Sequence, residues 1–104
     1  MLFRSLHERL ESVLLELLPA GLANVDEAAH RLAMSRRTLQ RKLKANGQTF
    51  NQMLSSTQAK LTKHYLKQGS LTKTEIAFLL GFSDPNSFFR ASKSWGIEKG
   101  ALLA

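Results

Sequence analysis

The sequence predicts an all-α fold. In several stretches apolar residues recur with the 3.6-residue period of a helix, and capping residues or Gly and Pro stops separate these stretches. No stretch alternates apolar and polar residues in the manner of a half-buried strand. The length of 104 residues suits one domain or two very small lobes, and a hydrophobic fraction of 43% is sufficient for a modest core.

The first expected element is an amphipathic helix from about Arg4 to Leu18, with leucines along one face and acidic residues mostly on the other. A Pro-Ala-Gly segment ends it. A short second helix is expected from about Val25 to Ala33. Asn24 precedes it as a cap, and Glu27 follows three residues later in a capping-box-like arrangement.

Ser35 is expected to cap a third helix over Arg36–Lys44, in which the two leucines lie on one face and basic residues on the others. Asn46-Gly47 is a left-handed stop signal for that helix. A longer linking helix is predicted from Phe50 to Gln68, where Gly69 ends it.

The last two helices have clear start signals. Thr72 and Glu75 have the spacing of a capping box, and Ile76 continues inward. Ser83 is expected to cap the final helix, with Asp84-Pro85 in its first turn and its end near Trp95.

Two parts of the sequence repeat each other. Residues 28–35 align with residues 76–83 at an offset of 48, and past the cap the offset becomes 49. Each copy has a short apolar helix, a turn with a small and then a large apolar residue, and a polar-faced helix, which is the layout of a helix-turn-helix. The linking helix between the copies would span roughly 27 Å, close to the ~34 Å between successive major grooves of DNA.

These patterns predict two helix-turn-helix subdomains joined by a long linking helix, with an extra N-terminal amphipathic helix. The expected domains are residues 1–48 for the N-terminal helix and first lobe, 49–68 for the linking helix, and 69–104 for the second lobe and tail.

The charge distribution indicates a polyanionic partner. Fifteen Lys and Arg face eight Asp and Glu, for a net charge of +7, and no acid lies between Glu27 and Glu75. Surfaces built only for solubility intersperse both signs, so a long basic run without acids favours nucleic-acid contact over a merely solvated face.

The sequence resembles the DNA-binding domain of the AraC/XylS family of bacterial transcription regulators. The matching motifs are Met34–Lys44 with Gly47–Phe50, and the more specific Glu75–Ala91, and the resemblance covers about Asn24 to Trp95. The segment Leu17–Gly21 is similar to family members that carry an effector-binding domain upstream. The chain is therefore expected to be part of a longer regulator whose upstream effector-binding domain is missing.

The resemblance implies sequence-specific binding of double-stranded DNA, with two recognition helices in adjacent major-groove segments. It carries base contact over to Arg37, Gln40, Arg41, Asn86, Ser87 and Arg90. Arg suits bidentate contact with guanine, and Gln or Asn with adenine. Contacts with the DNA backbone are expected from Ser35, Arg36, Lys42, Lys44 and Ser83.

Several positions depart from the family pattern, among them Ser94, where a basic residue is usual, and the tail after Trp95. Gln58 stands where the linking helix usually has Arg, and Thr62 where it usually has Ala. Ser92 stands where a core Phe is usual, so that the second lobe lacks an aromatic; Phe89 either compensates for it or is exposed.

Other classes of function are disfavoured or kept as alternatives. The lack of cysteine, of catalytic motifs and of a metal-binding pattern among His7, His30 and His64 predicts a non-enzyme without metal or cofactor. No apolar run is long enough to span a membrane, and a cytoplasmic protein is expected. The alternatives are a basic helical RNA-binding module, for which Phe89 is the one candidate stacking aromatic, and a protein-interaction module, for instance one docking on RNA polymerase.

Overall fold

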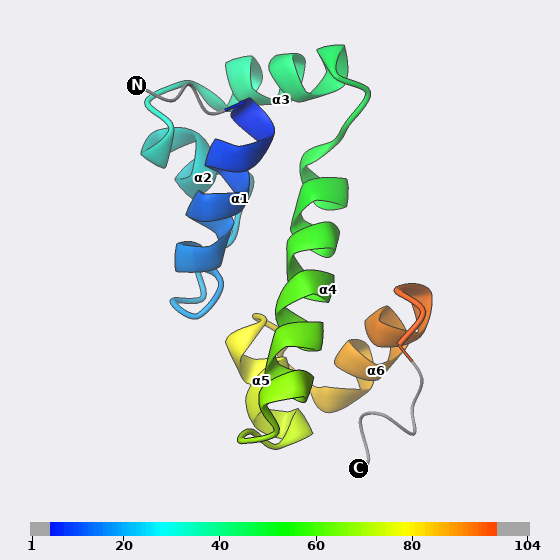
Figure 1. Cartoon of the computed structure of the whole chain (residues 1–104). Helices are drawn as coiled ribbons and strands as arrows, with labels where there is room; N and C mark the ends of the chain where they lie inside the picture. Colours follow the sequence, from blue (N-terminus) through cyan, green and yellow to red (C-terminus); the bar gives the residue numbers. More distant parts are fainter. Residues whose placement is uncertain (1–4, 98–104) are drawn as a thin grey trace. The chain divides into compact units, whose positions relative to one another are not determined.

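The computed structural model describes residues 5–97, and this part of the chain contains helices and no strand (Figure 1). The prediction of an all-α fold is confirmed. In chain order the helices are α1 Leu6–Leu17, α2 Val25–Arg31, α3 Arg36–Ala45, α4 Phe50–Gln68, α5 Lys73–Leu79 and α6 Pro85–Ser94.

The chain divides into two compact units within α4, the first ending at Thr57 and the second beginning at Gln58. The first unit holds α1, α2, α3 and the start of α4; the second holds the rest of α4 with α5 and α6. Each unit therefore contains one short helix followed by one polar-faced helix, and each has a hydrophobic core of its own.

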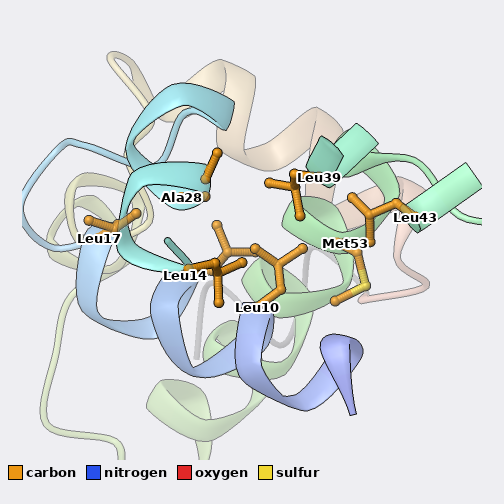
Figure 2. Packing of buried hydrophobic residues seen from close by; sticks show 9 residues of the cluster. Leu10, Leu14, Leu17, Ala28, Leu39, Leu43 and Met53 are labelled. Carbon is orange, nitrogen blue, oxygen red and sulfur yellow. The ribbon is translucent and has the colours of Figure 1, made fainter. Parts of the chain in front are cut away.

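The core of the first unit consists mainly of leucine side chains. Leu10 and Leu14 of α1 lie against Ala28 of α2, Leu39 of α3 and Met53 of α4, as Figure 2 shows. All of these side chains are almost completely buried. Because burial of a leucine side chain stabilises a protein by about 1.5–3 kcal/mol, α1 forms an integral part of this unit.

The first two helices are shorter than the sequence predicted. The helix expected from about Arg4 starts at Leu6, behind the N-cap Ser5, and Arg4 itself lies outside the described residues. The second ends at Arg31 and not near Ala33, because Leu32 is its C-cap and Ala33 takes a left-handed conformation with φ of 56°.

The turn between the two helices has the same hydrogen bonds in both units. Met34 N–H donates to Ala29 O at 3.0 Å, and 48 residues later Phe82 N–H donates to Ala77 O at 3.0 Å. The preceding residues, Ala33 and Gly81, both have positive φ, of 56° and 85°. This is the Schellman ending of a helix. Its left-handed conformation explains the glycine at position 81, whereas Ala33 adopts the same conformation at a cost.

The N-cap of the last helix was predicted one residue too early. Asp84, not Ser83, caps α6, and its side chain accepts a hydrogen bond from Ser87 N–H at 2.9 Å. Ser35 caps α3 as expected, by accepting from Thr38 N–H at 3.1 Å. The two caps are therefore Ser35 and Asp84, and the offset of 49 already applies at the cap. The second copy has one more residue in its turn.

The core of the second unit accommodates Ser92 without an aromatic at that position. Ser92 is completely buried, next to a core that includes Phe88. Phe89 compensates in part, because it is half-buried against this core and its ring lies 5.9 Å from that of Phe88. Trp95 and Tyr65 also pack here.

The two unusual residues of the linking helix form hydrogen bonds in the second unit. Gln58 Nε2 donates to the carbonyl oxygen of Leu80, the C-cap of α5, at 2.8 Å. Thr62 is completely buried and its hydroxyl donates to Gln58 O at 2.8 Å. The side chain of Gln58 therefore links α4 to the end of α5, where a carbonyl without a partner inside the helix needs a donor.

The conformation of Ala33 predicts that Ala33→Gly stabilises the first unit. A left-handed conformation costs a non-glycine residue about 1–2 kcal/mol, and the greater freedom of glycine in the unfolded chain offsets part of the gain. The free energy of unfolding, from urea titration, should rise by about 0.5–1 kcal/mol.

Gly47→Ala is the matched control for that substitution. Gly47 has φ of 72° and open space around the position of a Cβ atom, so that an added methyl group meets only backbone strain. Gly47→Ala should therefore lower the free energy of unfolding by about 1 kcal/mol. Equal signs for the two substitutions would contradict this interpretation of the turn.

The buried hydroxyl of Ser92 predicts a second stabilising change. Ser92 Oγ has no hydrogen-bond partner among the residues that the structure describes, and an unsatisfied buried hydroxyl costs about 1–3 kcal/mol. Ser92→Ala should raise the free energy of unfolding by about 1 kcal/mol. Thr62→Val is the control: it removes a buried hydroxyl that does have a partner, so it should lower the free energy of unfolding. A lower free energy of unfolding in Ser92→Ala would show that the Ser92 hydroxyl is satisfied.

Candidate nucleic-acid interface

Helix α3 presents a polar face opposite two core leucines. Leu39 and Leu43 are buried, whereas Arg37, Gln40 and Arg41 are exposed. These three predicted base-contact residues are three and four positions apart, so they lie on one side of the helix. The structure thus brings together the whole predicted base-contact set of the first unit.

The remaining predicted contacts of the first unit, Ser35, Arg36, Lys42 and Lys44, are exposed too. Arg36 Nη1 lies 3.6 Å from Asp26 Oδ2, and both side chains are more than half exposed. Such an ion pair contributes only about 0–1 kcal/mol, so Arg36 can readily leave Asp26 and bind another anion. Within residues 5–97, the side chains of Arg37, Gln40, Arg41, Lys42 and Lys44 form no hydrogen bond or ion pair.

The charges in the first turn of α3 oppose the helix dipole, whereas Lys42 and Lys44 in its last turn suit it. The first turn of α3 contains no acid, whereas α1, α2 and α5 each have one or two there. Arg36 and Arg37 occupy that turn, where the helix dipole favours negative charge. Positive charge at this end is unfavourable for folding and favourable for binding an anion at the same place.

Helix α6 presents a smaller polar face. Asn86 and Arg90 are exposed, and Ser87 is half-buried. Arg90 Nη2 donates a hydrogen bond to Ser87 Oγ at 3.2 Å, and Ser87 Oγ–H donates to Asp84 Oδ2 at 2.9 Å. Ser83, the predicted backbone contact, is exposed in the turn before the helix. Two of the three base-contact candidates of α6, Ser87 and Arg90, are thus already bonded to each other, unlike those of α3.

Two carboxylates of the second unit have lowered pKa values. Hydrogen bonds from the backbone and then the side chain of Ser87 lower the pKa of Asp84, and the charge of Arg90 adds to this effect. The backbone and side chain of Thr72 lower the pKa of Glu75 in the predicted capping box, which is present in full. Both acids are therefore ionised at neutral pH, and Asp84 brings negative charge to the face that carries Arg90.

Sequence reasoning did not single out Phe78. This residue is 75% exposed on α5, beside the buried Ile76 and Ala77. Its equivalent in the first unit, 48 residues earlier, is the exposed His30. The helical period of α5 gave the signal, because a helix that buries positions 76, 77 and 80 turns position 78 outward.

Other kinds of site find no support in the described residues. No group of three or more His, Asp or Glu residues within 5–97 could hold a metal ion. Over the same range, every helix is too short or too polar to serve as a membrane span.

Two short helix pairs with the same turn, each ending in an exposed polar helix, define a helix-turn-helix protein. A family model described as a helix-turn-helix domain matches residues 28–96, well over half of the chain. The chain belongs to this family, in its AraC/XylS branch, as the sequence motifs predicted.

Curated relatives support this assignment. The chain is 38% identical over 77 residues to the ornithine utilization regulator of Pseudomonas aeruginosa, covering 74% of this chain and 23% of that protein. It is 33% identical over 91 residues to the transcriptional regulator VirS of Mycobacterium tuberculosis, covering 88% of this chain and 27% of that protein. It is 36% identical over 80 residues to the transcriptional activator RhaS of Escherichia coli, covering 73% of this chain and 29% of that protein.

The chain thus spans about a quarter of the length of these relatives. No solved structure matches it at a significant level.

The basic first turn of α3 predicts that Arg37→Glu stabilises the first unit. Glu at this position suits the helix dipole, so the free energy of unfolding should rise by about 0.5 kcal/mol at low salt. Arg41→Glu changes the net charge equally but lies in the middle of α3 and serves as the control. A gain in Arg41→Glu as large as that in Arg37→Glu would attribute the effect to net charge and not to the helix end.

Proposed function

We propose that this helix-turn-helix domain binds double-stranded DNA in a sequence-specific way, with α3 and α6 as recognition helices in adjacent major-groove segments. One observation carries the proposal: α3 exposes a row of basic and amide side chains without internal partners among the described residues, on a helix that contains no acid. A helix that is merely solvated has no need of uncompensated cations in its first turn, where they lower its stability.

Base reading is assigned to Arg37, Gln40 and Arg41 in the first unit. An Arg guanidinium can grip O6 and N7 of guanine with two hydrogen bonds, and the Gln amide can do the same to N6 and N7 of adenine. The side chains are exposed and unengaged, so no internal hydrogen bond must break before they bind a base.

Asn86, Ser87 and Arg90 are proposed to read bases from α6. Fewer groups are free there, since Ser87 and Arg90 are bonded to each other, and the half-buried Phe89 stands where α3 has Gln40. The first unit should therefore contribute more of the base discrimination than the second.

Backbone contacts are assigned to Ser35, Arg36, Lys42, Lys44 and Ser83. Phosphate contacts set the register of a protein on DNA without reading its sequence, and the N-terminus of α3 adds amide donors for the same purpose. Because each neutralised phosphate releases counterions, affinity should fall steeply with salt.

The relatives are transcription regulators about four times longer than the chain. We therefore infer that the domain acts as the C-terminal, DNA-binding part of a bacterial transcription regulator in the cytoplasm. An upstream effector-binding domain and RNA polymerase are the partners that this role would involve.

Selection of bound duplexes from a random pool, followed by competition, tests the proposal. The chain should enrich a defined duplex sequence, and an unrelated duplex or an RNA of equal length should compete for it weakly. Enrichment of no sequence, or stronger competition by RNA, would contradict the proposed function.

Two substitutions on α3 should weaken binding in different ways. Arg41→Ala removes a proposed base contact, so it should cost about 1–3 kcal/mol on the selected duplex and relax the preference at one base pair. Lys44→Ala removes a proposed phosphate contact, so it should weaken binding to all duplexes alike and reduce the salt slope by about one. If Arg41→Ala left both affinity and preference unchanged, α3 would not be the reading helix.

A further inference from the structure

A chain of hydrogen bonds runs along the exposed side of α6. Asp84 uses both carboxylate oxygens on Ser87: Oδ1 accepts from the backbone N–H and Oδ2 from the hydroxyl, each at 2.9 Å. Ser87 Oγ then accepts from Arg90 Nη2 at 3.2 Å. Since these residues are three positions apart in a helix, each can reach the next without leaving the helix surface.

Which groups donate and which accept in this series of hydrogen bonds follows from the number of donors. A serine hydroxyl has one hydrogen to donate. Because that hydrogen is directed to the Asp84 carboxylate, the lone pairs of Ser87 Oγ remain for the guanidinium of Arg90. Asp84 therefore determines which way the hydroxyl points, although it forms no direct hydrogen bond with Arg90 in the described residues.

The first unit has the equivalent cap without the link to arginine. Ser35 and Thr38, 49 residues earlier than Asp84 and Ser87, have their hydroxyls 2.9 Å apart. The side chain of Arg41, the equivalent of Arg90, forms no hydrogen bond or ion pair with another of the residues 5–97. The second copy thus differs from the first in holding its arginine in place before any ligand is bound.

Negative charge at this position is unfavourable for general DNA affinity. Serine would cap α6 as well as aspartate does, as Ser35 does for α3, and it would not repel phosphates. What Asp84 adds to the cap is the orientation of Ser87 and, through it, of Arg90. An arginine side chain that is already ordered loses less conformational freedom when it grips a base.

We propose that Asp84 is a positioning residue for base recognition: through Ser87 it holds the Arg90 guanidinium for reading one base pair, so that it increases discrimination while it lowers affinity for unrelated DNA. This inference rests on the proposed function of α6. It assigns to Asp84 a role in specificity besides the capping of the helix.

The test measures the 104-residue chain on the selected duplex, on its single-base variants and on an unrelated duplex. The base pair read by Arg90 is the one at which Arg90→Ala loses its preference. Ser87→Ala breaks the link but keeps the cap through the backbone, and should reduce the preference at that base pair about three- to tenfold.

Asp84→Asn keeps a good N-cap but presents an amide N–H to Ser87 Oγ and removes the negative charge. It should reduce the same preference and yet raise the affinity for the unrelated duplex by about twofold or more at low salt. A residue that only stabilises α6 would shift both affinities in the same direction. Thermal unfolding of each variant shows whether α6 remains folded.

Two controls separate this role from others. Thr38→Ala, the equivalent change in the first unit, should leave the preference at the base pair read by Arg41 unchanged. In an Arg90→Ala background, Ser87→Ala should cause no further loss of preference at the base pair read by Arg90, whatever Ser87 contributes at another base pair. A further loss at that base pair would show that Ser87 acts there without Arg90 and would overturn the proposal.

Unchanged preference in both Ser87→Ala and Asp84→Asn would also overturn it, while the proposed function would stand. A wild-type chain that binds the selected and the unrelated duplex equally well would contradict the proposed function itself.

Discussion

The left-handed residue between the two helices of each pair is the constraint on which the rest of the structure depends. Ala33 and Gly81 end α2 and α5 with positive φ, and the next residue closes the same backbone hydrogen bond in both units. That geometry turns the chain sharply, so that α3 and α6 can each bury one face against the unit's core. A helix that buries only one face leaves its other faces exposed, and both proposed recognition helices arise in this way.

The two cores differ in how much of the surface of α3 and α6, the proposed recognition helices, they leave exposed. In the first unit, Leu39 and Leu43 are sufficient to anchor α3, because α1 supplies further leucines to the core. The remaining faces of α3 can therefore carry cations that oppose its dipole. In the second unit the position equivalent to Leu43 is Ser92, and Phe89 turns a position of the polar face toward the core. Because Phe89 contributes to the core, α6 has a smaller polar face for the proposed recognition than α3 has.

Much of this fold could be predicted from the sequence, because the signals are local. The bounds of α4, the cap at Ser35 and the capping box at Thr72 follow from residue types and spacing. The cap of α6 was misplaced because Ser83 and Asp84 are adjacent and both suit the role. The positive φ of Ala33 was not foreseen, since alanine gives no signal for that conformation. The link from Asp84 to Arg90 could not be predicted either, because it depends on side-chain rotamers that spacing permits but does not determine.

The account assigns to the two units one mode of DNA recognition with different strengths, and chemical protection of guanine N7 on the selected duplex tests it most directly. The account predicts two protected major-groove stretches centred about one helical turn apart. Arg41→Ala should remove protection in one stretch only, and Arg90→Ala in the other only. A single protected stretch, or loss of protection in the same stretch with both substitutions, would contradict it.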